Sequence, residues 1–235
     1  MKKKIFKFII ITFSVFIVLI IYLSSVGIET EKFNNQIKDR IIKADNNLDI
    51  KLKKIKLTLD PINFKVNAKT VGTTIFYSKK PLSLEYIKTQ VSLISLIKNK
   101  IISSNIEIVT RSILLKDLVR FIRASNNTPQ LFILEKIINN GFIILDIKLN
   151  LDEFGNIKND YEVNGFLQDG KINFLRKNNF ENISFNFNLK KDNYKFKEIK
   201  FTNNKINFTS KLLNIKKKQN TFFLEGEFEN KKAVL

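Results

Sequence analysis

The chain has 235 residues and a formal net charge of +19, and it contains no cysteine, no histidine and no tryptophan. Without cysteine there can be no disulfides and no thiolate metal sites, and without histidine the commonest general base and metal ligand are missing. We expect no nucleic acid partner, because the lysines alternate with apolar residues along the chain. Anionic lipid headgroups are a better partner for this charge, and the alternative, which we prefer for any single lysine, is a solvated lysine face without a partner.

An uncharged apolar run from Phe8 to Val26 follows a basic start of four lysines within the first seven residues. A helix of that length spans roughly 28 Å, which is near the hydrocarbon thickness of a bilayer. By the positive-inside rule the basic end stays in the cytoplasm. Residues 1–27 are therefore predicted to form a cytoplasmic start and a single-pass anchor, with the rest exported. The alternative is a cleavable signal peptide ending near Gly27.

Residues 28–140 are predicted to form a mixed α+β region. Apolar residues at helical spacing predict an amphipathic helix over Glu29–Asn46, which we expect to plug one end of the following sheet or to lie on the membrane. From Leu48 the period changes to two, which is typical of strands, with a bulge-like phase shift at Lys53–Lys54. Short helices are expected over the following three segments: Ser92–Asn99, Arg111–Asn126 and Leu131–Asn139, the last with its C-cap at Asn140–Gly141.

From Gly141 to the end, residues 141–235, we expect only strands and turns, with one strand and one turn every 10–12 residues. A hairpin loop over 152–156 would pair Leu151 with Ile157, and this register places Ile147 opposite Tyr161 and Leu145 opposite Val163. Asp169–Gly170 marks a corner, and the phase slips near Lys197–Glu198 as in a bulge. The repeat predicts a β-meander of consecutive hairpins.

The fold class is thus an N-terminal transmembrane helix plus a mainly β, curved antiparallel meander or groove with a few short helices. Its strands have one apolar and one polar face, and the apolar face must be covered by a second sheet, by closure into a barrel or by an apolar ligand. An apolar stripe of this kind is either core or a ligand groove. If it is a groove, these residues are the candidates for contact with acyl chains: Leu145, Ile147, Leu149, Tyr161, Val163, Phe185, Phe187, Phe208 and Phe222.

Three features give the chain a resemblance to the AsmA-like family, which includes TamB and YhdP. They are the basic start with its anchor, the Leu48–Pro61 strand pair, and the Val91–Ile108 stretch followed by hairpins such as Phe154–Gly170. The resemblance covers most of the chain and implies an inner-membrane, single-pass protein of Gram-negative bacteria whose C-terminal part is periplasmic. It also implies a β-groove for phospholipid acyl chains and a role in outer membrane biogenesis. Family members of the bridging type are much longer, so the chain is either the N-terminal part of a longer protein or a short member with envelope-protein partners.

An enzyme is not expected, because no Ser-His or Cys-His pair, histidine-rich metal site or phosphate-binding glycine loop is present in the sequence. No cofactor or metal is expected either. Two alternatives to lipid transfer remain open. One is a membrane-anchored structural or assembly factor with a closed β-sandwich or an open pairing edge, and the other is a component of lipopolysaccharide transport.

Overall fold

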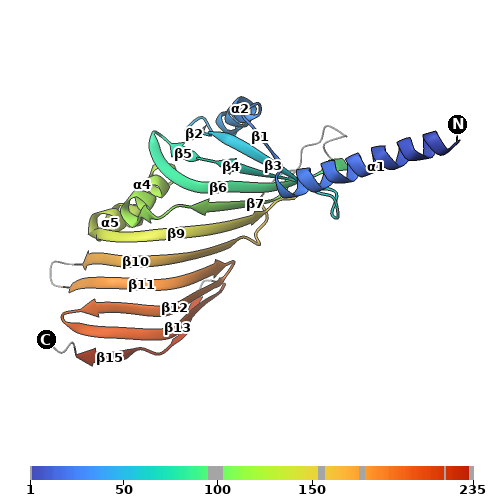
Figure 1. Cartoon of the computed structure of the whole chain (residues 1–235). Coiled ribbons are helices and arrows are strands. Elements are labelled where there is room, and N and C mark those ends of the chain that lie inside the picture. Colours follow the sequence, from blue (N-terminus) through green and yellow to red (C-terminus); the bar gives the residue numbers. More distant parts are fainter. Residues whose placement is uncertain (1, 95–102, 153–156, 175–177, 220, 233–235) are drawn as a thin grey trace.

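The computed structural model describes residues 2–94, 103–152, 157–174, 178–219 and 221–232. Within these residues, a projecting N-terminal helix leads into one large antiparallel sheet that carries three short helices (Figure 1). The helices are α1 (Lys2–Ser25), α2 (Asn34–Ala44), α4 (Leu115–Ser125) and α5 (Pro129–Ile137). The predicted helix at Ser92–Asn99 falls mostly outside the described residues.

The strands before β6 have three to seven residues, whereas β6 and β9 to β13 have 11 to 13. The first eight are β1 (Ile28–Thr30), β2 (Leu48–Lys51), β3 (Lys54–Asp60), β4 (Lys65–Val71), β5 (Thr74–Tyr77), β6 (Lys80–Ser92), β7 (Ser103–Thr110) and β8 (Ile113–Leu114). The others are β9 (Ile138–Asn150), β10 (Glu162–Phe174), β11 (Asn178–Lys190), β12 (Asn193–Asn203), β13 (Ile206–Lys218), β14 (Thr221–Gly226) and β15 (Glu229–Lys232).

The sheet is a single, curved and unclosed layer, which confirms the predicted fold class. Its main path runs β1-β3-β4-β6-β7-β9-β10-β11-β12-β13-β14, and every described pairing is antiparallel. The small β2-β5 ladder joins the sheet through the first residues of β6. The boundary expected at 140/141 falls inside β9, and β9 pairs directly with β7, so one sheet continues across it.

Helix α1 is joined to the sheet by a very short connection. Over Lys3–Ser25 it is long and apolar enough to cross a membrane, and none of this span is buried in the protein. Only two residues separate its end from β1, which pairs with β3 through Ile28↔Leu57 and Thr30↔Ile55. Gly27 makes this connection possible, because its φ is +74° and a Cβ there would collide with the Leu57 carbonyl.

Two helices begin later than the periodicity predicts. The helix expected from Glu29 begins at Asn34, because Ile28–Thr30 are recruited as an edge strand by β3. It lies at the β1/β2 end of the sheet (Figure 1), where the Lys38 side chain pairs with Asp49 of β2 at 3.4 Å. The helix expected from Arg111 begins at Leu115, since Ile113 and Leu114 pair with β9. In both cases sheet pairing overrides the helical pattern.

A predicted helix C-cap, a predicted bulge, a predicted corner and one predicted register differ from the structure. Asn140–Gly141 is not a helix C-cap, because α5 ends at Ile137 and β9 begins at Ile138. Lys53 separates two strands with different partners, so it is a strand break and not a bulge. Asp169–Gly170 is a bulge inside β10 and not a corner. The Leu151↔Ile157 bridge forms, but Ile147 pairs with Val163 instead of Tyr161, because residues between Ile157 and Glu162 loop out.

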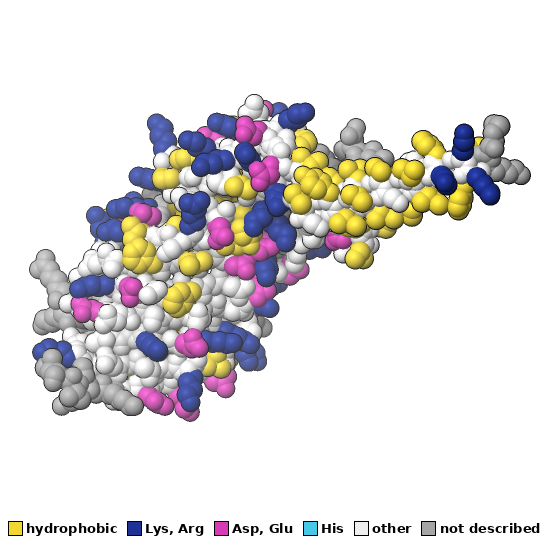
Figure 2. Space-filling view, viewed as in Figure 1, with side chains coloured by type: hydrophobic (Ala, Val, Ile, Leu, Met, Phe, Trp, Pro, Cys, Tyr) yellow, Lys and Arg dark blue, Asp and Glu magenta, His cyan; other side chains and the backbone are white. Residues whose placement is uncertain are grey.

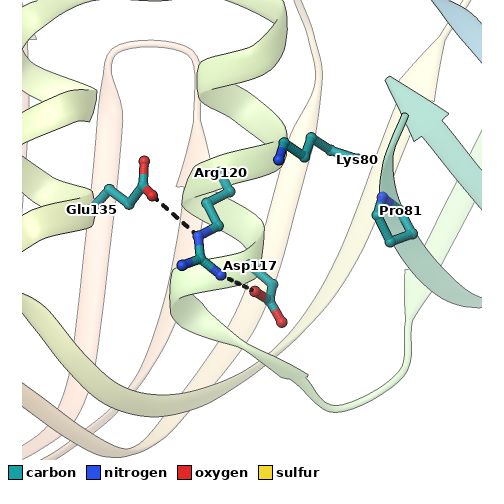
Figure 3. A pocket seen from close by; sticks show the side chains of 5 residues that line it. All are labelled: Lys80, Pro81, Asp117, Arg120 and Glu135. Atoms are coloured by element: carbon teal, nitrogen blue, oxygen red, sulfur yellow. Dashed lines mark hydrogen bonds and ion pairs between the residues drawn. The ribbon is translucent and has the colours of Figure 1, made fainter. Parts of the chain in front are cut away.

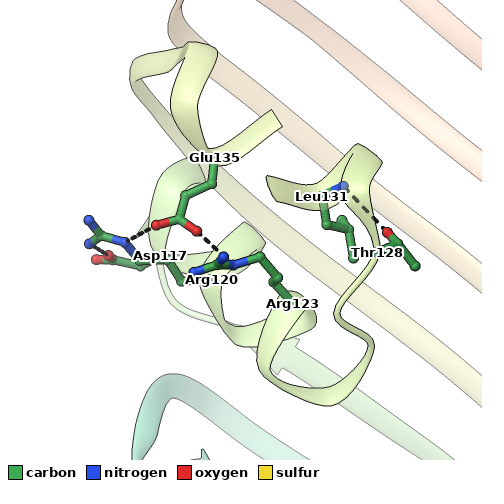
Figure 4. Close-up of polar contacts among 6 residues, drawn as sticks. All are labelled: Asp117, Arg120, Arg123, Thr128, Leu131 and Glu135. Atoms are coloured by element: carbon green, nitrogen blue, oxygen red, sulfur yellow. Dashed lines mark hydrogen bonds and ion pairs between the residues drawn. The ribbon is translucent and has the colours of Figure 1, made fainter. Parts of the chain in front are cut away.

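Helices α4 and α5 are fastened to each other by one acidic side chain. Glu135 of α5 bonds Arg120 at 3.1 Å and Arg123 at 2.8 Å, and Arg120 also reaches Asp117 (Figure 4). The Thr128 hydroxyl accepts a bond from the Leu131 amide and caps α5. A hollow of about 560 Å³ lies next to this network and is lined by Lys80, Pro81, Asp117, Arg120 and Glu135 (Figure 3). Because its acids and arginines are paired with each other, we assign it a structural role.

The Glu135 network predicts a loss of stability in acid. Burial alone would raise the pKa of Glu135, but its bond from Arg120 and the charges of Arg123 and Arg120 outweigh burial and lower it. A bond from Asn188 likewise lowers the pKa of Glu162. A carboxylate whose pKa is lowered in the folded state stabilises the fold above its ordinary pKa of 4.5. This stabilisation is lost as the pH falls from 4.5 through the lowered pKa. Thermal unfolding from pH 7 to pH 3 should show this loss, and the slope should be shallower in Glu135→Gln. Identical slopes would contradict it.

Candidate lipid-binding face

The antiparallel registers bring apolar side chains into one continuous row across eight neighbouring strands. Each member is the direct cross-strand partner of the next, so all lie on the same face of the sheet. The row consists of Ile87, Ile108, Ile147, Val163, Leu189, Tyr194, Ile215 and Leu224. All are half-buried except Leu224 on β14, which is exposed. We call the side of the sheet that carries this row the apolar face.

Aromatic rings widen the apolar face over β11 to β13. Phe185 and Phe187 of β11 lie next to Phe196 of β12, with ring centroids between 5.6 and 6.5 Å apart. Further along the same strands, Phe201 stacks on Phe208 at 4.9 Å. These distances are typical of favourable ring contacts. The rings therefore cover part of each other's surface from water, although the sheet is a single layer.

Helix α4 covers only one part of the apolar face. Leu118 of this helix packs with Ile143 and Leu145 of β9 in a buried cluster that also includes Leu167 and Ile183. Helix α5 reaches β9 and β10. Among the described residues, no helix packs extensively on β11 to β14. The face is thus protein core near α4 and a half-exposed apolar surface farther along the sheet.

A line of backbone irregularities bends the long strands at matching places. Asp169 of β10, Asn182 of β11 and Glu198 of β12 all have φ between +52° and +54°, and Gly141 of β9 has φ +137°. A Cβ on Gly141 would approach the Gly170 backbone at 3.2 Å, which puts the irregularities side by side. Aligned bulges of this kind bend a sheet and interrupt the alternation of its side chains. The bulge predicted at Lys197–Glu198 is confirmed by the conformation of Glu198.

The opposite face of the sheet is mostly polar, although Phe142 and Ile144 of β9 and Phe166 of β10 are exposed on it. Lysine and glutamate residues form cross-strand neighbours there, such as Lys88 and Glu107, and Lys148 and Glu162. A hollow of about 1210 Å³ over β11 to β14 also belongs to this face and is lined mostly by polar and charged residues, among them Lys197, Lys200 and Glu225. Figure 2 shows basic and acidic side chains scattered over the visible surface, with apolar side chains concentrated on α1. The chemistry of this hollow suits water and ions better than acyl chains.

The ends of the strands nearest α1 carry a group of lysines. Lys191 lies in the β11–β12 turn, and Lys216, Lys217 and Lys218 end β13 at the same end of the sheet. Lys217 and Lys218 lie over the rings of Phe222 and Phe223 at 5.9 and 5.6 Å. We call Lys191 and Lys216–Lys218 the basic rim. Positive charge at this position is suited to anionic headgroups.

Most of the residues predicted from the sequence lie on the apolar face, but their surroundings differ. Ile147, Leu149, Val163, Phe185 and Phe187 are half-buried on three neighbouring strands. Leu145 is buried in the cluster under α4, and Phe208 stacks on Phe201. Tyr161 precedes β10, and Phe222 is 55% exposed on the edge strand β14.

The sequence-based candidate set missed several members of the row. Ile87, Ile108, Leu189, Tyr194 and Ile215 alternate with polar residues in the same way as the chosen residues do. The signal for them was therefore present, but the order of the strands was needed to show that they adjoin Ile147 and Val163. Comparison with protein-family models, with curated proteins and with solved structures found no significant match.

Proposed function

We propose that this chain is a membrane-anchored β-protein that holds acyl chains of phospholipids on its apolar face and assists their transfer toward the outer membrane. The observation that supports this most strongly is the apolar row across eight strands, of which α4 and α5 cover only a part. An uncovered apolar surface costs roughly 25 cal/mol per Å², so a bound apolar ligand would stabilise the protein.

The resemblance to AsmA-like proteins adds the location to this proposal. The anchor α1 would lie in the inner membrane with its lysines in the cytoplasm, and the sheet would be periplasmic. Acyl chains would contact the apolar face, and headgroups would stay in water beside the basic rim. Transfer would then exchange one apolar environment for another without covalent chemistry, so the chain would not act as an enzyme. Other envelope proteins would carry the phospholipid over the rest of the distance to the outer membrane.

Photolabelling of the whole chain tests this proposal. The protein would be reconstituted in vesicles that contain a phospholipid with a diazirine on its acyl chain, and labelled residues would be mapped by mass spectrometry. We expect label on β9 to β13, at apolar-face residues such as Ile147, Val163 and Phe187, in addition to α1. Label confined to α1, with no phospholipid co-purifying with the protein, would contradict lipid binding by the sheet.

A second candidate function is an assembly factor that pairs through its open edge. Strand β14 supports this alternative, because Phe222, Phe223 and Leu224 are each more than half exposed on a strand paired on one side. Such an edge can accept a strand from another β-protein. A lipid-free, thermally stable protein that crosslinks to a partner through β14 would favour this function over lipid transfer.

A further inference from the structure

The turn between β3 and β4, residues 61–64, carries two large apolar side chains with little protein around them. Ile62 is 87% exposed, the highest value for a large apolar side chain among the described residues, and Phe64 is 65% exposed. Isolated exposed apolar residues are common on protein surfaces and need no special explanation. Two of them at the tip of one turn form an apolar patch, and this patch lies beside the membrane anchor α1.

The sheet register places this turn beside the membrane anchor. Strand β1 is antiparallel to β3, with Ile28 opposite Leu57 and Thr30 opposite Ile55. The chain before Ile28 therefore approaches the end of β3 at Asp60, where the turn begins, and α1 also contacts β3. Figure 1 shows α1 continuing beyond this end of the strands with the β3–β4 turn next to it. The turn and the anchor thus leave the sheet at the same end.

The depth of the turn matches the apolar part of α1. By extension of the register, Leu59 lies about level with Val26, where the uncharged run ends. The three steps from Leu59 to Ile62 carry the chain at most roughly 10 Å further, which equals about seven residues of helix. Ile62 and Phe64 would then lie between the levels of Leu19 and Val26, inside the outer part of the apolar span. Ile and Phe side chains are stable at that depth, and the polar side chains of Asp60 and Asn63 in the same turn bond to each other.

The turn is built to hold these side chains outward. The Asp60 carboxylate accepts bonds from the Asn63 amide at 3.1 Å and from the Asn63 side chain at 2.9 Å. Phe64 has a φ of +51°, an unusual conformation for a bulky residue, and its carbonyl accepts a bond from the Leu93 amide at 2.9 Å. Next to Leu93, Ile94 is a third exposed apolar side chain, at 58%. Strain of this kind persists where the surrounding structure imposes it.

We propose that Ile62 and Phe64 insert into the bilayer that holds α1, as a second membrane contact that fixes the sheet against the lipid surface. A single helix allows the attached sheet to rotate about its axis and to tilt. A second contact beside the helix removes this freedom and brings the same end of the strands, with the basic rim, toward the headgroups. This inference depends on α1 spanning the membrane and not on lipid carriage by the apolar face.

The absence of tryptophan from the chain makes a direct test possible. The full chain carrying Ile62→Trp or Phe64→Trp would be reconstituted in vesicles of dioleoylphosphatidylcholine and dioleoylphosphatidylglycerol, with and without brominated phosphatidylcholine. Ile133→Trp is the matched control, since Ile133 is 54% exposed on α5 at the other end of the strands. We expect the emission at positions 62 and 64 to be blue-shifted and quenched by bromine at least about twofold, as for a ring within the bilayer, and position 133 to be unaffected.

Three results would overturn the proposal. They are emission at positions 62 and 64 equal to that at 133, equal quenching at all three positions, and failure of the protein to float with the vesicles. Circular dichroism of each variant verifies that the sheet is retained. Labelling of the apolar face by a photoreactive lipid is independent of this result, so failure of this proposal and failure of the proposed function can be distinguished.

Discussion

Two acidic residues on the apolar face are expected to reduce lipid photolabelling of the sheet to a tenth or less. The variant is Leu189→Asp with Ile215→Asp, which changes β11 and β13 on either side of Tyr194. Both side chains are half-buried and lie outside the core cluster under α4. A carboxylate facing acyl chains loses its hydration, and each 1.4 kcal/mol of lost binding energy is about a tenfold change in affinity. Mass spectrometry of labelled peptides measures the effect.

The matched control changes the same region on the other face. Lys197 and Leu212 are cross-strand partners on β12 and β13, and both are exposed on the polar face. Lys197→Asp with Leu212→Asp should leave the labelling of the sheet near the wild-type level. If both double variants retain labelling, the apolar face does not bind the lipid. If both lose labelling together with the circular dichroism of the sheet, Leu189→Ala with Ile215→Ala replaces the acidic variant.

Gly27→Ala is expected to detach β1 from β3 and so loosen the junction between the anchor and the sheet. The new Cβ would collide with the Leu57 carbonyl and lie 2.7 Å from the Thr58 Cγ2, at a φ of +74°. The left-handed conformation costs about 1–2 kcal/mol, and the collision with backbone adds a cost of about 1–3 kcal/mol. Hydrogen exchange at the amides of Ile28–Thr30 should therefore become much faster while exchange in β9 to β13 is unchanged.

Gly72→Ala is the control for the conformational part of this cost. Gly72 has a similar φ of +63°, but the three atoms nearest to its Cβ would all belong to the flexible side chain of Lys53. We expect a smaller loss of stability, confined to the β4–β5 turn. Equal and small effects of the two substitutions would show that the junction tolerates a side chain at position 27, against the prediction.

The general architecture could be read from the sequence because its signals are local. An uncharged run at Phe8–Val26 gives the anchor, and period-two alternation gives the strands and their two faces. Turn residues are also local signals, and Asn204 and Lys205 do form a turn with positive φ between β12 and β13. Helix ends were less predictable, since pairing of Ile113 and Leu114 with β9 depends on residues distant in the chain.

The candidate face could be predicted only in part, because burial depends on how elements pack. Leu145 and Ile147 have the same local pattern, yet α4 covers Leu145 and leaves Ile147 half-buried. The bend at Asp169 was read as a corner, since Asp-Gly is typical of turns. Nothing in the pattern of one strand shows that its neighbours carry similar irregularities at Asn182 and Glu198.

The direction in which α1 leaves the sheet determines what the strands can span. Helix α1 continues roughly along the strands (Figure 1), so if it crosses a bilayer as proposed, the strands would stand upright on that bilayer and the series from β1 to β14 would run parallel to its surface. The height reached above the lipid is then about the length of a thirteen-residue strand, roughly 43 Å at 3.3 Å per residue. Further strands at the β14 edge would widen this upright wall without raising it. Lipid tails, which also stand upright in a leaflet, could slide onto it without turning.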